Sequence, residues 1–113
     1  YLKVKNHDAL ITNKYNGKAI KIPIAHGEGR FFADKNTLNE LEENNQIIFQ
    51  YCDKNGIVDD DSNPNGSLLN IAGICNKNRN VFGMMPHPER AADPILNNID
   101  GINLFKSILS YTK

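Results

Sequence analysis

The apolar residues of this chain occur in short runs separated by polar turns, and this pattern most restricts how the chain can fold. Short runs rich in β-branched and aromatic side chains predict strands. Asn16-Gly17 predicts a hairpin turn, and Pro23 favours a sheet edge or a bulge for the run that contains it. The predicted strands are residues 2–5, 18–25, 46–52, 70–75 and 80–85, and the apolar run 9–11 is a sixth candidate.

Two segments have the spacing of amphipathic helices. Asp34 or Asn36 can cap a helix over residues 37–43. A second helix is predicted to begin at residue 99 or 100 and to end near residue 111. At 113 residues, the sequence therefore predicts one α/β domain that is strand-rich and has two helices.

The composition excludes several classes of protein. Acidic and basic residues balance at 13 each, for a formal net charge of zero, so we expect no nucleic-acid partner. No apolar run approaches the roughly 20 residues that a membrane span needs, so we expect no membrane partner. The two cysteines have neither a disulfide framework nor a zinc spacing, which indicates a reducing, cytoplasmic compartment.

The segment Pro86-His87-Pro88-Glu89 carries the clearest chemical signal. Proline fixes its own φ and favours an extended conformation in the residue before it, so His87 is expected to be extended just after a strand. Side chains two residues apart in an extended chain lie on one side, which brings Glu89 to His87. A histidine oriented by a carboxylate is the base of a nucleophilic triad. A rigid surface turn with an exposed histidine is the plain alternative.

Neither cysteine fits the nucleophile that this base requires. The elbow of an α/β-hydrolase-like site has the form Gly-x-nucleophile-x-Gly and opens into a helix. Cys75 follows Gly73 at the right spacing, but Lys77 stands where the second glycine belongs and another predicted strand follows. Cys75 and Cys52 are therefore predicted to be buried structural residues, and no nucleophile is expected in this chain.

A second pair, His26 and Glu28, lies between glycines, which let backbone approach a ligand closely. With His87 and Glu89 it would supply ligands that suit zinc or iron, so a metal-dependent hydrolase is an alternative. Neither pair has the helical spacing of common metal motifs, and we expect no metal. No phosphate-binding loop is present, so we expect no ATP site or other cofactor in this chain.

Four segments, residues 25–31, 63–67, 71–74 and 84–90, occur in an order and at a spacing that resemble one family. They make the chain similar to the class I (triad) glutamine amidotransferases, and in particular to the glutaminase subunits of phosphoribosylformylglycinamidine synthases. Pro-x-Glu after a catalytic histidine is common in this class, whereas His-Gly-Glu-Gly-Arg combined with Asn-Pro-Asn-Gly-Ser is much more specific.

The resemblance implies a glutaminase reaction. A cysteine would attack the side-chain amide of glutamine, His87 would take up and return the proton, and Glu89 would orient His87. The ammonia would pass to a large synthetase subunit, which holds ATP and Mg²⁺ and converts formylglycinamide ribonucleotide to formylglycinamidine ribonucleotide in purine synthesis. His26, Glu28 and Asn65 would contact glutamine or this partner, and a small accessory subunit is a further candidate partner.

One departure from the family pattern concerns the nucleophile. The family carries it on a Gly-x-Cys-Asn-Gly elbow far ahead of the Pro-His-Pro-Glu segment, and this chain has no such elbow. Tyr1 also begins within a predicted strand, without an initiator methionine. We therefore expect the C-terminal half of a flavodoxin-like class I domain, inactive by itself, with an open apolar sheet edge. A binding fragment without catalytic activity is the remaining alternative.

Overall fold

The computed structural model describes residues 1–6, 12, 15, 18–23, 30–79, 81–92, 94–96 and 98–111. Its sheet has four strands in the order β1-β2-β3-β4, and every neighbouring pair is antiparallel. The strands are β1 (Leu2–Val4), β2 (Ile47–Tyr51), β3 (Ile71–Cys75) and β4 (Phe82–Met84). The helices are α1 (Lys35–Glu43) and α2 (Ile102–Tyr111). Short 3-10 turns are η1 (Asp60–Ser62), η2 (Leu68–Asn70), η3 (Pro88–Ala91) and η4 (Pro94–Leu96).

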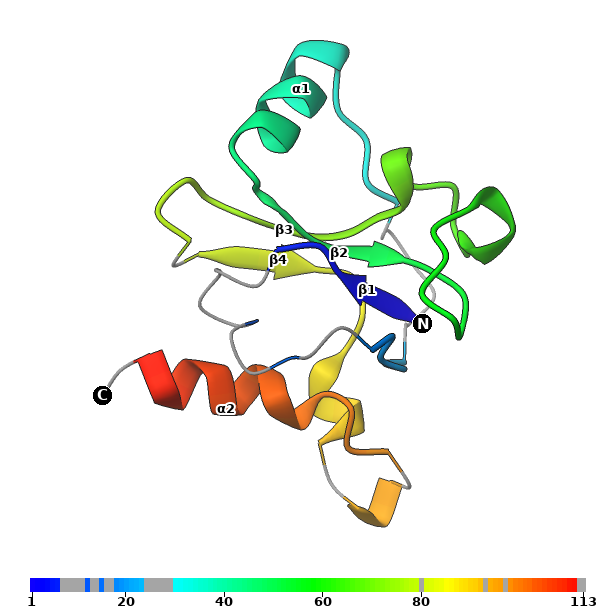
Figure 1. Cartoon of the computed structure of the whole chain (residues 1–113), viewed down its shortest axis with the longest axis vertical. Coiled ribbons are helices and arrows are strands. Elements are labelled where there is room, and N and C mark those ends of the chain that lie inside the picture. Colours follow the sequence, from blue (N-terminus) through cyan, green and yellow to red (C-terminus); the bar gives the residue numbers. More distant parts are fainter. Residues whose placement is uncertain are drawn as a thin grey trace.

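The two helices cover opposite faces of the sheet. Figure 1 shows α1 over one face and α2 over the other, so the described part of the chain has three layers. The smaller apolar cluster joins Leu41 of α1 to Ile47 and Ile71 of the sheet. The larger cluster includes Leu104 of α2. The predicted α/β class with two helices is confirmed.

β2 is an inner strand that is buried on both faces. Ile47 is 1% exposed and packs in the α1 cluster, whereas Ile48 and Phe49 are 0% exposed and pack in the α2 cluster. The register between β2 and β3 shifts on both sides of Phe49. Such an irregularity re-aims side chains, which explains why two successive residues serve one face. The ring of Phe49 also meets that of Tyr15 edge to face, with centroids 6.2 Å apart.

The predicted first helix is confirmed, and Asp34 is its cap. The Asp34 side chain accepts a hydrogen bond from the Thr37 amide at 2.7 Å, and this bond holds the pKa of Asp34 below its ordinary value. The helix begins at Lys35, earlier than predicted, because the capping residue is Asp34 rather than Asn36. Asn45, at φ 53°, then turns the chain toward β2.

The predicted strand over residues 18–25 is wrong for the residues that the structure describes there. Ile20 makes a single bridge with Leu2, and no ladder extends from it. Side chains of the distant turn before α2 bind both backbone groups of Lys21, and Pro23 has no amide hydrogen. The backbone groups that a strand would use are therefore engaged elsewhere or missing.

Two other predictions differ in extent. The last helix begins at Ile102 because residues 98–100 form a turn closed by a hydrogen bond from the Asp100 amide to the Asn98 side chain. The last predicted strand is shorter and spans Phe82–Met84. The apolar run 9–11 and the hairpin turn at 16–17 lie outside the described residues.

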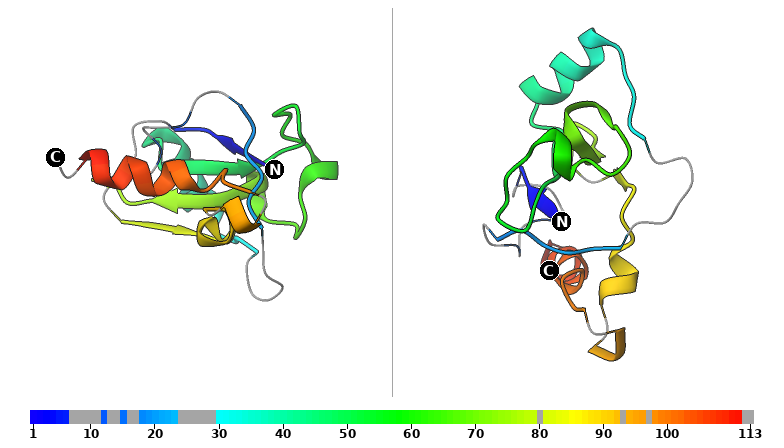
Figure 2. Two further views of the ribbon diagram at one scale, coloured as in Figure 1. Left: turned by 90° about the horizontal axis from the view of Figure 1, so that it is seen from below. Right: turned by 90° about the vertical axis from the view of Figure 1, so that its right-hand side faces the viewer.

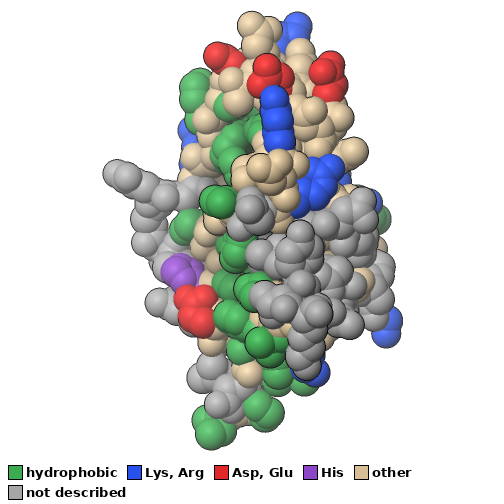
Figure 3. Space-filling view, turned by 90° about the vertical axis from the view of Figure 1, so that its left-hand side faces the viewer, with side chains coloured by type: hydrophobic (Ala, Val, Ile, Leu, Met, Phe, Trp, Pro, Cys, Tyr) green, Lys and Arg blue, Asp and Glu red, His purple; other side chains and the backbone are tan. Residues whose placement is uncertain are grey.

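β4 forms one edge of the described sheet. Val81 is 64% exposed and Phe82 36% exposed beside it. Figure 3 shows hydrophobic side chains in a column down one side of the molecule.

Among the described residues, no helix has the length and apolar character that crossing a membrane requires.

Gly73 of β3 has no room for a side chain. A Cβ atom there would lie 3.0 Å from Phe49 Cδ2 and 3.2 Å from Met84 Cβ. We expect Gly73→Ala to lower the free energy of unfolding by about 1–3 kcal/mol, as overpacked cores do. Gly83→Ala is the matched control, because nothing lies within 4 Å of its added Cβ. Urea unfolding of the two variants measures the difference, and equal midpoints would contradict the packing described for Gly73.

Candidate active site

β4 leads directly to His87. The Met85 amide still donates to the Ala72 carbonyl at 3.0 Å, so the pairing with β3 continues past the end of β4. The next residue, Pro86, is buried. The amide of His87 then donates to the Pro23 carbonyl at 2.8 Å. His87 therefore follows the strand, as predicted, and its backbone is held at φ −107° and ψ 89°.

Glu89 reaches His87 by a different route from the one expected. η3 begins at Pro88, so Glu89 lies in a 3-10 turn and not in an extended chain. Proline suits the start of a helical turn because its φ is already fixed and it has no amide hydrogen to satisfy. Glu89 Oε1 lies 2.8 Å from His87 Nδ1. The predicted meeting of the two side chains is confirmed, and the extended geometry offered for it is wrong.

This contact determines which ring nitrogen of His87 can accept a proton. When Nδ1–H donates to the carboxylate, the lone pair of Nε2 is the one that accepts a proton. The His87 and Glu89 side chains are 33% and 58% exposed. Exposed ion pairs contribute at most about 1 kcal/mol to stability, so the pair matters more for orienting the ring than for folding.

Both cysteines have the surroundings of structural residues. Cys75 ends β3 and is 5% exposed, and Cys52 directly follows β2 and is 2% exposed. Burial raises the pKa of each thiol. The thiolate, which is the reactive form, is therefore disfavoured at neutral pH.

Two of the predicted site residues, His26 and Glu28, lie outside the described residues. Of the four side chains considered for a metal, the two that the structure describes, His87 and Glu89, are in contact. Within the described ranges, no group of three or more His, Cys, Asp or Glu side chains is arranged to hold a metal ion.

Asn65 lies in a loop whose own side chains hold it together by hydrogen bonds. Its Oδ1 accepts from the Ser67 amide at 3.1 Å, and its Nδ2 lies 3.5 Å from the hydroxyl of Tyr51. The Asn63 side chain accepts from the Gly66 amide at 2.8 Å. Gly66 has a φ of 73°, a value that favours glycine. Asn65 is therefore a residue that shapes this loop from within.

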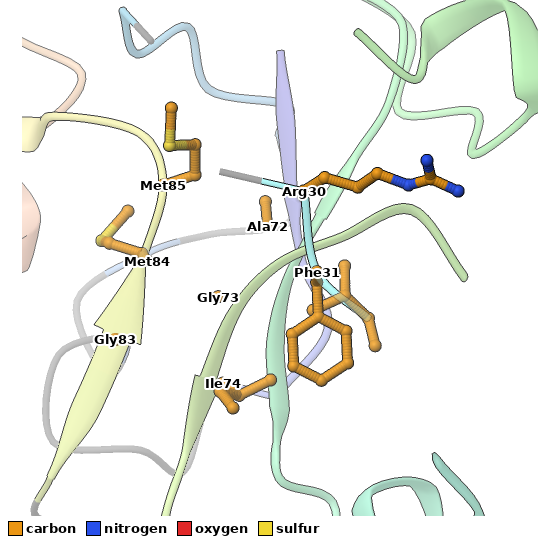
Figure 4. Close-up of a pocket in the computed structure, with 9 residues that line it drawn as sticks. Arg30, Phe31, Ala72, Gly73, Ile74, Gly83, Met84 and Met85 are labelled. Carbon is orange, nitrogen blue, oxygen red and sulfur yellow. The ribbon is translucent and has the colours of Figure 1, made fainter. Parts of the chain in front are cut away.

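A cavity of about 340 Å³ lies between Phe31, β3 and β4 (Figure 4). Met84 and Met85 line it just ahead of His87. The Arg30 side chain extends away from the methionines (Figure 4), and its Nε donates to the Gly66 carbonyl at 3.1 Å. Sequence reasoning missed this cavity and the contact of Arg30. The one available signal was that Arg30 directly follows the His-Gly-Glu-Gly motif.

Known proteins are similar to this chain in sequence and in fold. Residues 1–111 match the model of the CobB/CobQ-like glutamine amidotransferase domain. The phosphoribosylformylglycinamidine synthase subunit PurQ of Methanocaldococcus jannaschii is 50% identical over 114 residues, which cover 100% of this chain and 50% of that protein. The subunit of the same name from Methanosarcina barkeri is 53% identical over 111 residues, or 97% of this chain and 48% of that protein.

A solved structure of PurLQS from Thermotoga maritima matches 99% of this chain and 45% of that chain, with a TM-score of 0.77 and 38% identity. This match confirms the predicted class I amidotransferase fold. The chain spans about half the length of the curated relatives it matches. Because the family model extends over nearly all of its residues, the chain belongs to the CobB/CobQ-like glutamine amidotransferase domain family.

Proposed function

We propose that this chain supplies the base and its orienting carboxylate to the glutamine-hydrolysing site of a phosphoribosylformylglycinamidine synthase. The observation that carries the proposal is the 2.8 Å contact between His87 Nδ1 and Glu89 Oε1. Relatives named as PurQ subunits of that enzyme, at 50% and 53% identity, support the assignment. In this proposal the chain is the C-terminal half of the subunit, and the preceding half carries the cysteine nucleophile.

In the proposed reaction, a cysteine thiol outside this chain transfers its proton to Nε2 of His87 as its sulfur attacks the amide carbon of glutamine. His87 then returns the proton to the leaving nitrogen, and ammonia departs. A water molecule, deprotonated by the same Nε2, hydrolyses the thioester to glutamate and frees the thiol. Glu89 holds the imidazole in the required tautomer throughout.

The ammonia passes to a large synthetase subunit, which we propose as the main partner, with a small accessory subunit as a second. ATP and Mg²⁺ belong to the synthetase, where ammonia converts formylglycinamide ribonucleotide to formylglycinamidine ribonucleotide. The similarity to a chain of the PurLQS structure supports this assembly. We propose that His26, Glu28 and Asn65 contact glutamine or the synthetase. No observation among the described residues favours a metal-dependent hydrolase.

Removing the base tests the catalytic assignment. In the full-length subunit with its synthetase, we expect His87→Ala to lower kcat for glutamine hydrolysis by about 10²–10⁴-fold, because proton transfer by a positioned side chain contributes that much. Lys106→Ala, a change at an exposed position of α2, is the control and keeps wild-type activity. Circular dichroism verifies that both variants fold. Activity of His87→Ala within a few-fold of wild type would end the assignment.

This chain by itself is expected not to hydrolyse glutamine, because the thiols of Cys75 and Cys52 are buried and their pKa values are raised. Glutamate release and mass spectrometry of the chain after incubation with glutamine measure this. Cys75→Ser serves as the control for any adduct. Detection of a glutamyl thioester on Cys75 would overturn the prediction and place the nucleophile within the chain.

The loop around Asn65 tests the proposed contact role. Asn65→Ala removes the acceptor of the Ser67 amide, and the loss of one such bond is worth about 0.5–1.5 kcal/mol. We therefore expect the dissociation constant for glutamine or for the synthetase to rise by roughly 2–10-fold. Calorimetry of both equilibria measures the change. Asn55→Ala, in the neighbouring exposed turn, is the control. Unchanged values for both ligands would count against a contact role.

A further inference from the structure

We propose that the turn formed by residues 98–101, which we call the positioning turn, fixes the direction of the His87 imidazole. The inference rests on the proposed role of His87 as the base. The turn directly precedes α2 and contacts the two segments that hold the backbone around His87, residues 21–23 and η3. Figure 2 shows η3 beside the start of α2, with the segment from residue 18 to 23 running past both.

The first contact joins the turn to Pro88, the residue that follows His87. A Cβ atom on Gly101 would lie 2.3 Å from the Pro88 carbonyl oxygen and 3.0 Å from Pro88 Cα. The Gly101 amide also donates to the Ala91 carbonyl at 2.8 Å. The turn therefore lies directly against the backbone of η3, with no side chain between them. Because Pro88 links His87 to Glu89, any displacement of Pro88 changes how those two side chains meet.

The second contact joins the turn to the segment that holds the amide of His87. The Lys21 amide donates to Asp100 Oδ2 at 2.7 Å, and the Lys21 carbonyl accepts from Asn98 Nδ2 at 2.7 Å. The Asp100 backbone amide donates to Asn98 Oδ1 at 2.9 Å, which joins the Asn98 side chain to the Asp100 backbone, so the two residues act as one unit. Two residues beyond Lys21, the Pro23 carbonyl accepts from the His87 amide at 2.8 Å.

The backbone of His87 is thus held on both sides of its Cα atom, and the positioning turn contacts both of the segments that hold it. The His87 side chain is 33% exposed, so packing alone does not surround the ring. Its direction therefore depends on the backbone and on Glu89, and both depend on the positioning turn. A misplacement of about 1 Å in a catalytic group can reduce a rate by about 10²-fold.

A turn that only stabilised the fold would leave His87 unchanged in molecules that remain folded. The ¹⁵N chemical shifts of the His87 ring distinguish the two roles, because they report the tautomer that Glu89 selects. In the full-length subunit we expect Asp100→Ala to move these shifts away from the Nδ1–H tautomer while the protein stays folded. Asp100→Asn retains a side-chain oxygen for the Lys21 amide and is expected to restore the shifts. Lys106→Ala is the control and leaves them unchanged.

Two further variants keep the proposal falsifiable if Asp100→Ala does not fold. Gly101→Ala displaces Pro88 directly, whereas Asn98→Ala removes one side chain from the unit that binds Lys21. Each is expected to shift the His87 ring nitrogens in the folded protein, as judged by urea unfolding. Folded variants with ring shifts identical to wild type would overturn the proposal.

Activity separates this inference from the proposed function. In the full-length subunit with its synthetase, Asp100→Ala is expected to lower kcat by about tenfold with KM within about twofold, and Asp100→Asn to restore it. If His87→Ala retains activity, the proposed function fails while the ring shifts still report on the turn. If His87→Ala is inactive and Asp100→Ala keeps wild-type kcat and ring shifts, the positioning role alone fails.

Discussion

The burial of β2 on both faces is the constraint on which the rest of the structure depends. Ile47 packs toward α1, while Ile48 and Phe49 pack in the cluster that includes α2. Full burial of each such side chain is worth about 1.5–3 kcal/mol, and a slip of one residue would turn each toward the wrong layer. Because β3 pairs with β2 and β4 pairs with β3, this register also sets where the chain leaves the sheet toward His87.

The site itself combines a held backbone with a partly exposed ring. Hydrogen bonds and close packing place the peptide groups on either side of His87, and Glu89 selects which ring nitrogen carries the proton. The imidazole remains one-third exposed. A base of this kind needs both properties, because its geometry must be set in advance while its second nitrogen reaches the reacting groups.

Sequence reasoning succeeded where the signal was local. Continuous apolar runs predicted β2 and β3, and the two candidate capping residues Asp34 and Asn36 predicted α1, although the helix begins earlier than expected. It failed for residues 18–23, the described part of a predicted strand whose alternation is typical of a strand, because the partners of Lys21 lie 77 and 79 residues farther along the chain. The contact of Arg30 with the loop at Gly66 was missed for the same reason, since it exists only after distant segments meet. The His87–Glu89 pair was found because the two residues lie two apart in the sequence on either side of Pro88, even though the turn differs from the one expected.

The supports of His87 also affect how sequences of this kind can vary. The acceptors in these supports are main-chain carbonyls, because the Pro23 carbonyl accepts from the His87 amide and the Ala91 carbonyl accepts from the Gly101 amide. Every amino acid carries such a carbonyl, so exchanging the side chain at an acceptor position leaves the acceptor in place. Gly101, which has no room for a side chain, and Asn98 and Asp100, whose side chains bind Lys21, record the support in their residue types. A short signature around the histidine therefore understates the stretch of polypeptide that holds it.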